Sequence, residues 1–285
     1  MFGVLQAKSW HDATQIAESL PDWVFRGQGD ARWPLETTLY RSALQLHYPS
    51  QHLFMAEDWM LREFRRRAHH YVADLPAHDD KLEWLALIQH FGGPTRLLDF
   101  TYSFYVAAFF AMERTGSEAA IWAIDRLELS QVIAEKTGAQ MDHESMADSN
   151  RRHVAAFLNS GRRAPIVANV EPERLNERLS IQQGLFLLPC DLDVPFASVL
   201  EQTFDWPAGY LAGECEAIPW QIGMAGQVAH EFSVVKILLP RAMHGTALQD
   251  LQRMNMNSAT LFPGLDGFAR SLYFHLRTFE IAGPA

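Results

Sequence analysis

Helix-like and strand-like apolar segments alternate along this chain, and that alternation is what most limits its fold. Residues 55–72 carry apolar side chains every three or four positions, with Met55, Trp59 and Phe64 on the apolar face, which predicts a helix. Residues 23–28 instead alternate with a period of two, which predicts a strand. Trp23 and Phe25 would then share one face of this strand. Intermixed elements of this kind favour one α+β domain with helical insertions.

The same patterns predict further elements on both sides of these two. Helices are expected at residues 12–20, 82–91, 103–114, 174–179, 242–254 and 267–274. Strands are expected at residues 95–101, 119–124, 164–170, 181–189 and 232–239. The sequence contains no repeat and no flexible linker. We therefore expect a single domain over 1–285, with a helical N-terminal segment (1–22), a core (23–274) and a C-terminal tail (275–285).

Composition excludes several classes of protein. The apolar fraction of 48% can fill a large core, but no apolar run reaches the roughly 18 residues that a membrane span needs. The first residues lack a signal-peptide pattern, and there are only two cysteines, Cys190 and Cys215, so we expect a soluble protein of the reducing cytoplasm. The net charge of −10 argues against broad electrostatic binding to nucleic acid.

Polar residues interrupt apolar runs in three places, where only a buried network or a ligand site would keep them. The three segments are 25–28, which reads FRGQ, 89–101, which reads QHFGGPTRLLDFT, and 178–186, which reads RLSIQQGLF. In the second segment, Arg96 and Asp99 point to opposite faces of the expected strand, because side chains alternate along a strand. Each therefore needs a partner other than its neighbour, or a ligand.

These three segments, with NSATLFPGLDGFA at 257–269, resemble successive signature blocks of the FRG domain, a family named for a triplet that is Phe25-Arg26-Gly27 here. The blocks run in the family's order from Val24 to about Arg270. The resemblance implies a fold more firmly than a reaction, since the family has long been described without an assigned activity.

A second resemblance is chemically more specific. Arg26 on a first strand, then 99–103 (DFTYS), then 106–111 (VAAFFA), is similar to the ADP-ribosyltransferase pattern. It implies a split, mixed β-sheet core that binds NAD as substrate in a cleft between two half-sheets. An arginine fork would hold phosphate, a hydroxyl would brace the ribose, and an anion would stabilise the cation formed as nicotinamide leaves.

Two positions depart from that pattern. The superfamily has a glutamate before the strand that here reads GLFLLP, and Gly184 stands near its place. Gln182 and Gln183 can form hydrogen bonds there but carry no negative charge. In addition, Thr101-Tyr102-Ser103 stands where Ser-Thr-Ser is expected. Either Asp99 supplies the charge, or transfer is poor, or the site only binds a nucleotide.

The resemblance implies a set of site residues. The catalytic residues would be Arg26, His90, Asp99 and Gln182. The contacts to NAD would come from Arg26, Gly27, Gln28, Gln89, Arg96, Thr101, Ser103 and Gln183. The expected function is transfer of ADP-ribose to an unidentified macromolecule, or hydrolysis of NAD, in a bacterial toxin or antiphage effector. No metal is expected, because His69 and His70 point in different directions on a helix.

Other interpretations stay open. The domain could be a non-catalytic module that binds a nucleotide or a protein, or a nuclease or phosphotransferase that uses His90 with Arg26 and Arg96. At the level of single residues, Arg26 could be a structural arginine tied to Asp99. His90 could cap its helix, and Gly27 could serve only the geometry of the backbone.

Overall fold

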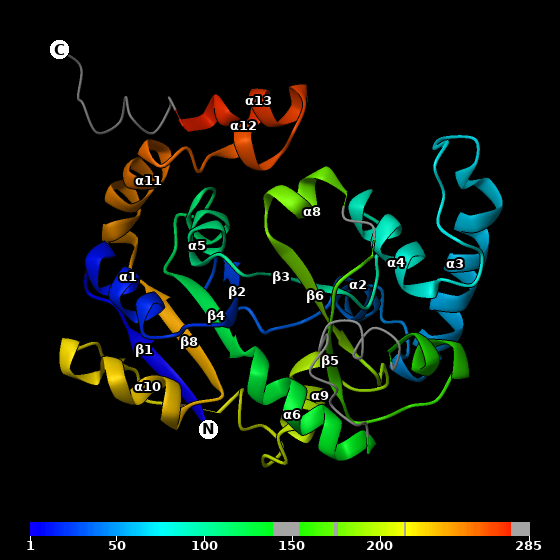
Figure 1. The fold of residues 1–285 in the computed structure, drawn as a ribbon, viewed down its shortest axis with the longest axis horizontal. Helices are drawn as coiled ribbons and strands as arrows, with labels where there is room; N and C mark the ends of the chain where they lie inside the picture. Colours follow the sequence, from blue (N-terminus) through cyan, green and yellow to red (C-terminus); the bar gives the residue numbers. More distant parts are fainter. Residues whose placement is uncertain (139–153, 174–175, 214, 275–285) are drawn as a thin grey trace.

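Among the residues that the computed structural model describes (1–138, 154–173, 176–213 and 215–274), eight strands form one open sheet. The strands are β1 (Phe2–Gln6), β2 (Trp23–Gln28), β3 (Leu98–Thr101), β4 (Ala119–Asp125), β5 (Val167–Val170), β6 (Gly184–Pro189), β7 (Ile218–Pro219) and β8 (Val234–Leu239). Their order is β5-β6-β3-β2-β4-β8-β1-β7. β1 runs parallel to β7 and β8, and the other pairs are antiparallel. The expected α+β class with a mixed sheet is confirmed (Figure 1).

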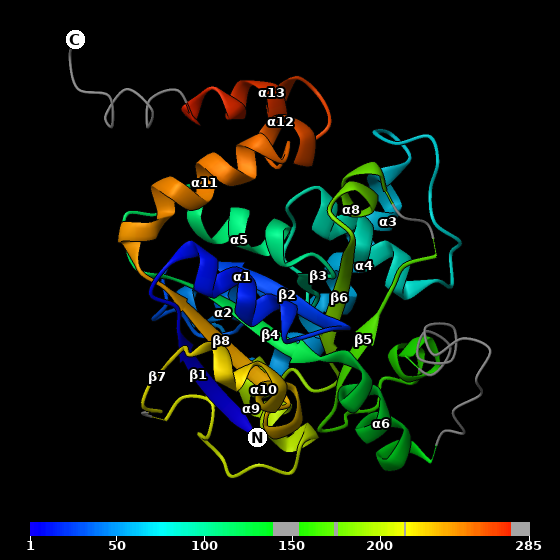
Figure 2. The same ribbon diagram turned by 60° about the vertical axis from the view of Figure 1, so that its left-hand side comes forward.

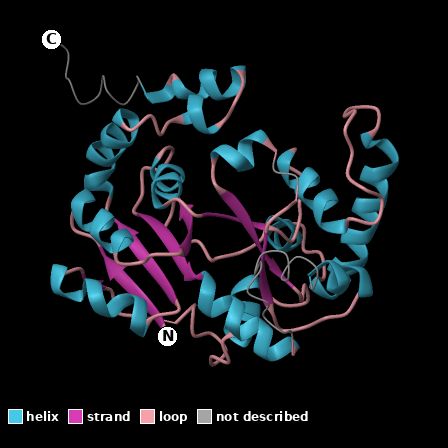
Figure 3. Ribbon diagram, viewed as in Figure 1, coloured by secondary structure: helices cyan, strands magenta, loops and turns pink. Residues whose placement is uncertain are grey.

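Helices cover both sides of this sheet (Figure 3). They are α1 (Trp10–Glu18), α2 (Thr38–Gln45), α3 (Leu53–Ala68), α4 (Lys81–His90), α5 (Phe104–Met112), α6 (Arg126–Thr137), α8 (Glu177–Ile181), α9 (Phe196–Thr203), α10 (Ala225–Glu231), α11 (His244–Arg253), α12 (Ser258–Leu261) and α13 (Leu265–Ser271), with short 3-10 turns at Ser50–His52, Ile222–Met224 and Arg241–Met243. Residues 154–160 are also helical. No helix of the described residues is long and apolar enough to pass through a lipid bilayer.

The expected faces of the first predicted strand are confirmed. Trp23 and Phe25 pack in one apolar core with α1, α5 and α11, while Val24 belongs to the core on the other face, with α6 and α9. Gly27 allows α5 to lie directly on β2, because a Cβ atom at that position would be only 1.9 Å from the carbonyl oxygen of Ala107.

Three expectations about the elements are wrong. The segment 1–22 is not wholly helical, since it begins with the buried strand β1, whose parallel partner β8 lies far along the chain. The apolar face of α3 is not the predicted one, since Met55 and Trp59 are exposed while Glu57 is buried. Gln182 and Gln183 are not on a strand, because α8 extends to Ile181 and β6 begins at Gly184. The expected tail, 275–285, lies outside the described residues.

The sheet is nearly divided between β2 and β3. These strands share one residue pair, Phe25 with Thr101, whereas β2 and β4 are paired along the whole length from Trp23 to Gln28. One half-sheet therefore holds β5, β6 and β3, and the other holds β2, β4, β8, β1 and β7. The opening between them places the side chain of Arg26 beside the backbone of β3.

Candidate functional site

A cleft with two adjoining cavities lies at this opening. The first, which we call the β2 cavity, has a volume of about 220 Å³ and is lined by Arg26, Gly27 and Thr101 among others. The second, the α4 cavity, has a volume of about 240 Å³ and is lined by Gln89 and His90 among others. Four residues line both cavities and form the wall that they share: Asp99, Arg178, Leu179 and Gln182.

Arg26 is a cation with unfilled hydrogen-bonding capacity. Its Nη1 donates to the carbonyl oxygen of Asp99 at 2.7 Å and lies 3.9 Å from the Asp99 carboxylate. Its Nε is buried and has no hydrogen-bond partner among the described residues. Burial lowers the pKa of Arg26, against the opposing effect of Asp99, and nearby Arg41 lowers it further. An anion in the β2 cavity would offset the cost of burying the charge.

Arg178, on α8, is a second cation of the cleft, and the sequence analysis did not select it. Its guanidinium lies 4.6 Å from the ring centroid of Phe262 and makes no hydrogen bond or ion pair with any described residue. Burial lowers its pKa, while Asp99 raises it. The available signal was its position as the first residue of the RLSIQQGLF block. Arg178 lines both cavities.

Asp99 stands between these two arginines and is held by Gln89. The Nε2 of Gln89 donates to the Asp99 carboxylate at 2.9 Å, and its Oε1 accepts a hydrogen bond from Thr95 at 2.5 Å. The Asp99 side chain is 56% exposed and borders both cavities. A fixed, accessible carboxylate beside a bound ligand is able to stabilise developing positive charge.

The hydroxyl and amide residues of the cleft are tied to backbone groups. Thr101 Oγ1 donates to the carbonyl oxygen of Gln182 at 2.6 Å, which joins the end of β3 to the turn before β6. The Gln182 side chain lines both cavities, and its Nε2 donates to the carbonyl oxygen of Leu261 at 2.8 Å. These bonds fix the shape of the cleft.

His90 ends α4 and lines the α4 cavity. Burial lowers its pKa from the ordinary value, and the charge of Arg178 lowers it further, so the imidazole is neutral at neutral pH. Its ring packs edge-on against Phe91 and forms no hydrogen bond with a described residue. A neutral imidazole beside the cleft can accept a proton.

Four residues predicted to contact NAD lie outside the lining of both cavities. Gln28 is buried and accepts a hydrogen bond from the indole of Trp122 at 2.8 Å. Ser103 caps the N-terminus of α5, and Gln183 has a left-handed backbone with φ of 49°. Arg96 is also in the core.

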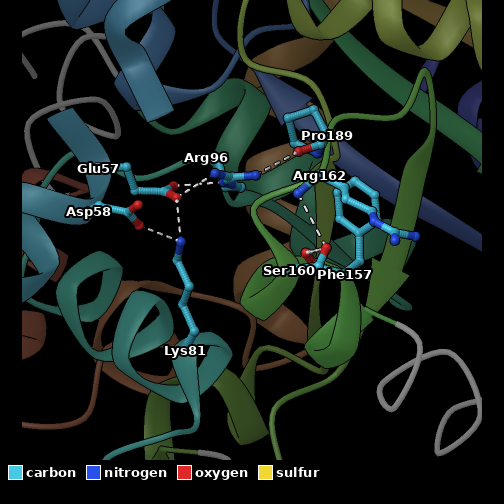
Figure 4. Close-up of polar contacts among 8 residues, drawn as sticks. All are labelled: Glu57, Asp58, Lys81, Arg96, Phe157, Ser160, Arg162 and Pro189. Atoms are coloured by element: carbon cyan, nitrogen blue, oxygen red, sulfur yellow. Dashed lines mark hydrogen bonds and ion pairs between the residues drawn. The ribbon is translucent and has the colours of Figure 1, made fainter. Parts of the chain in front are cut away.

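Arg96 belongs to a buried ion-pair network (Figure 4). Its Nε and Nη2 donate to the two oxygens of Glu57 at 2.7 and 2.5 Å, and both side chains are almost fully buried. Lys81 lies 3.6 Å from Glu57 and 2.7 Å from Asp58. The prediction that Arg96 binds NAD is therefore replaced by a structural role. Within the described ranges, no three metal-ligating side chains gather at one place.

Comparison with known families supports the first resemblance. A family model described as the FRG domain matches residues 21–120. Residues 21–120 thus correspond to the FRG domain model. The matched part of the FRG domain contains Arg26, His90 and Asp99, whereas Arg178 and Gln182 come from later in the chain. No curated protein and no solved structure matches the chain.

Proposed function

We propose that the cleft binds NAD and that the domain either transfers its ADP-ribose or hydrolyses it. The supporting observation is that Arg26 and Arg178 line one cavity together with Asp99, whose carboxylate lies 3.9 Å from Arg26 Nη1, and that Arg26 Nε has no hydrogen-bond partner among the described residues. A planar guanidinium suits the oxygens of a phosphate group better than a lone ammonium would. The pyrophosphate of a dinucleotide matches two such groups.

The shape of the cleft supports a ligand with two parts. The two cavities, of about 220 and 240 Å³, meet at a wall that carries Arg178 and Asp99. Their summed size lies within the range of roughly 300–1,000 Å³ typical of small-molecule sites. A nucleotide half in each cavity would leave the charged pyrophosphate at the shared wall.

The arrangement of the strands also fits the second resemblance. The three motif segments lie on neighbouring parts of the sheet: Arg26 on β2, Thr101 at the end of β3, and Gln182 immediately before β6. Segments far apart in the sequence thus meet at the cleft. The ADP-ribosyltransferase pattern requires that meeting, which supports the proposal.

The chemistry needs an anion, and Asp99 is the acidic residue that both cavities share. In the proposed reaction the glycosidic C–N bond of NAD breaks, and neutral nicotinamide leaves with the electron pair. The Asp99 carboxylate stabilises the oxocarbenium-like cation. Water or a macromolecular nucleophile then forms the new bond to carbon, and His90 accepts its proton.

Incubation with NAD labelled in the ADP-ribose part, followed by assay of free nicotinamide and of labelled products, tests this function. Wild-type protein should release nicotinamide, and Arg26→Ala and Asp99→Asn should abolish release. Arg253→Ala serves as a matched control, because Arg253 pairs with Asp250 on α11 and lines neither cavity. Release that persists unchanged in Arg26→Ala would remove the cleft from the reaction.

One observation favours the non-catalytic alternative. Gly184 stands near the place of the missing glutamate, and a Cβ atom there would lie 2.3 Å from the side chain of Leu179. A larger residue at this position would therefore require the Leu179 side chain to move. A nucleotide-binding module would show NAD binding by calorimetry with no nicotinamide released over hours.

A further inference from the structure

The orientation of Arg178 needs an explanation, because a long side chain with unfilled donors is otherwise free to turn away from the cleft. Ordering such a side chain has a cost in conformational entropy. The ring of Phe262 is in close contact with its guanidinium, at 4.6 Å from the centroid. A guanidinium over an aromatic face is attracted by the ring electrons, and more strongly where water is excluded.

Phe262 is itself fixed by several contacts. Its side chain is 6% exposed and packs edge-on against Phe110 of α5, with ring centroids 5.7 Å apart. The guanidinium of Arg270, on α13, also lies over the ring, at 4.1 Å. Arg270 in turn forms an ion pair with Glu113, the residue that caps the C-terminus of α5. The ring is therefore anchored to the helix that lies on β2.

The same short segment holds a second residue of the cleft. The carbonyl oxygen of Leu261 accepts a hydrogen bond from Gln182 at 2.8 Å, one helical turn beyond Arg178. α12 contacts α8, and in both Figure 1 and Figure 2 α12 and α13 stand at the same end of the molecule as α5 and α8. Two of the three residues that α8 and its C-cap give to the shared wall, Arg178 and Gln182, thus contact residues 261–262.

We propose that Phe262 is a positioning residue of the cleft, and that residues 257–271 complete its anion site by directing Arg178 toward the wall between the two cavities. This segment lies outside the matched region of 21–120 and includes the NSATLFPGLDGFA block. The ligand class is a pyrophosphate-containing anion. Only that ligand class rests on the proposed function, because the contact between Phe262 and Arg178 exists without any ligand.

The first measurement needs no ligand. In protein labelled with ¹⁵N-arginine, the Nε–Hε signal of Arg178 is assigned by its loss in Arg178→Lys. The Phe262 ring current should shift this signal, and Phe262→Leu should return it to the position of a free arginine. Phe262→Tyr retains an aromatic face and should keep the shift. Phe268→Leu is the matched control, since Phe268 lies on α13 with a 56% exposed side chain.

The second measurement is calorimetric titration with inorganic pyrophosphate and with ADP-ribose. Phe262→Leu should weaken both affinities about tenfold, the size of a partly desolvated cation–π contact. Phe262→Tyr and Phe268→Leu should stay within about twofold of wild type. Glu113→Gln, which releases Arg270 and leaves the ring in place, should produce a smaller loss than Phe262→Leu and controls for local unfolding.

The outcomes separate the two proposals. An Arg178 signal that does not move in Phe262→Leu overturns the positioning role, whatever the affinities. A wild-type protein that binds neither pyrophosphate nor ADP-ribose overturns the proposed function, while the arginine signal still decides the role of Phe262. Equal loss of affinity in Phe262→Leu and Phe262→Tyr, with the shift retained in the latter, also contradicts the role.

Discussion

Two arginines near the junction of β2 and β3 show how differently the same side chain is used. Arg96, just before β3, donates from Nε and Nη2 to Glu57 and from Nη1 to the carbonyl oxygen of Pro189 at 3.5 Å. Arg26, on β2, donates from Nη1 to the backbone of Asp99 and has a buried Nε without a partner. The first side chain is 1% exposed and the second 18%.

The difference distinguishes an arginine that stabilises the fold from one that is available to a ligand. A buried charge with a complete set of partners is part of the fold, and removing one partner exposes the desolvation cost of the other. A partly buried charge with free donors beside a cavity has no such role in the fold. The free energy lost in burying it is recovered only when a ligand binds. The predictions below test this contrast, from the largest expected effect to the smallest.

Breaking the buried pair should produce the largest effect. Arg96→Met leaves the Glu57 carboxylate with only Lys81, at 3.6 Å, and should lower the free energy of unfolding by about 3 to 5 kcal/mol. Urea denaturation measures the loss. The double variant Arg96→Met/Glu57→Met should recover most of it, and a double variant no better than the single one would contradict the pairing.

Unlike Glu57, the buried carboxyl group of Glu36 forms no ion pair with a described residue, so its ionisation should destabilise the folded state. Glu36 is 4% exposed and accepts hydrogen bonds from the backbone N–H groups of Thr37 and Phe196, and burial raises its pKa to about 7. The folded state therefore holds this proton more tightly than the unfolded state, whose carboxyl has the ordinary pKa of 4.5. Stability should fall by about 3 kcal/mol as the pH rises from about 4.5 to about 7.

Urea denaturation of Glu36→Gln at several pH values checks this dependence. The variant should lose the slope that Glu36 contributes, because its side chain does not titrate. Glu201→Gln offers a control, since Glu201 is also buried and accepts backbone hydrogen bonds, from Gly209 and Leu211. If Glu36→Gln keeps the wild-type dependence of stability on pH, another group is responsible for it.

The wall of the β2 cavity depends on close contact between β2 and α5. Gly27→Ala would place its Cβ atom 1.9 Å from the oxygen of Ala107 and 2.7 Å from the nitrogen of Ala111, so the backbone must move. We expect a loss of about 1 to 3 kcal/mol in a denaturation experiment. Gly29→Ala is the matched control, because the nearest atom to its Cβ would be 3.4 Å away. Equal stability of the two variants would show that α5 does not press on β2.

The smallest effect on stability is expected at Arg26. Arg26→Met removes one hydrogen bond and also the cost of a buried, unsatisfied donor, so the free energy of unfolding should change by no more than about 1 kcal/mol. The affinity for NAD should nevertheless fall at least about tenfold, measured by calorimetry. A stability loss as large as that of Arg96→Met would make Arg26 a structural arginine.

Local patterns predicted the parts of this molecule that depend on neighbouring residues. The two faces of β2 followed from alternation. Arg96 and Asp99 lie in separate networks, but Arg96 precedes β3, so strand alternation is not the reason for their separation. Arg26, His90, Asp99 and Gln182, selected from the sequence, all line the cleft.

The parts that depend on distant partners were missed. β1 is recognisable only through its pairing with β8, and the buried face of α3 includes Glu57 because Arg96 lies opposite. A hydrophobic pattern assigns an acidic residue to solvent, so it could not find that face. Arg178 depends in the same way on Phe262, which comes much later in the chain.

A single residue pair, Phe25 with Thr101, joins the two half-sheets, and we call this junction the seam. A ladder of several backbone bonds resists separation cooperatively, whereas one pair opens almost independently of the rest. Amide protons along this seam should therefore exchange with solvent sooner than those between β2 and β4. The cleft therefore borders the strand junction with the fewest residue pairs. Widening the cleft would disrupt the packing of α5 on β2 more than the pairing of the strands.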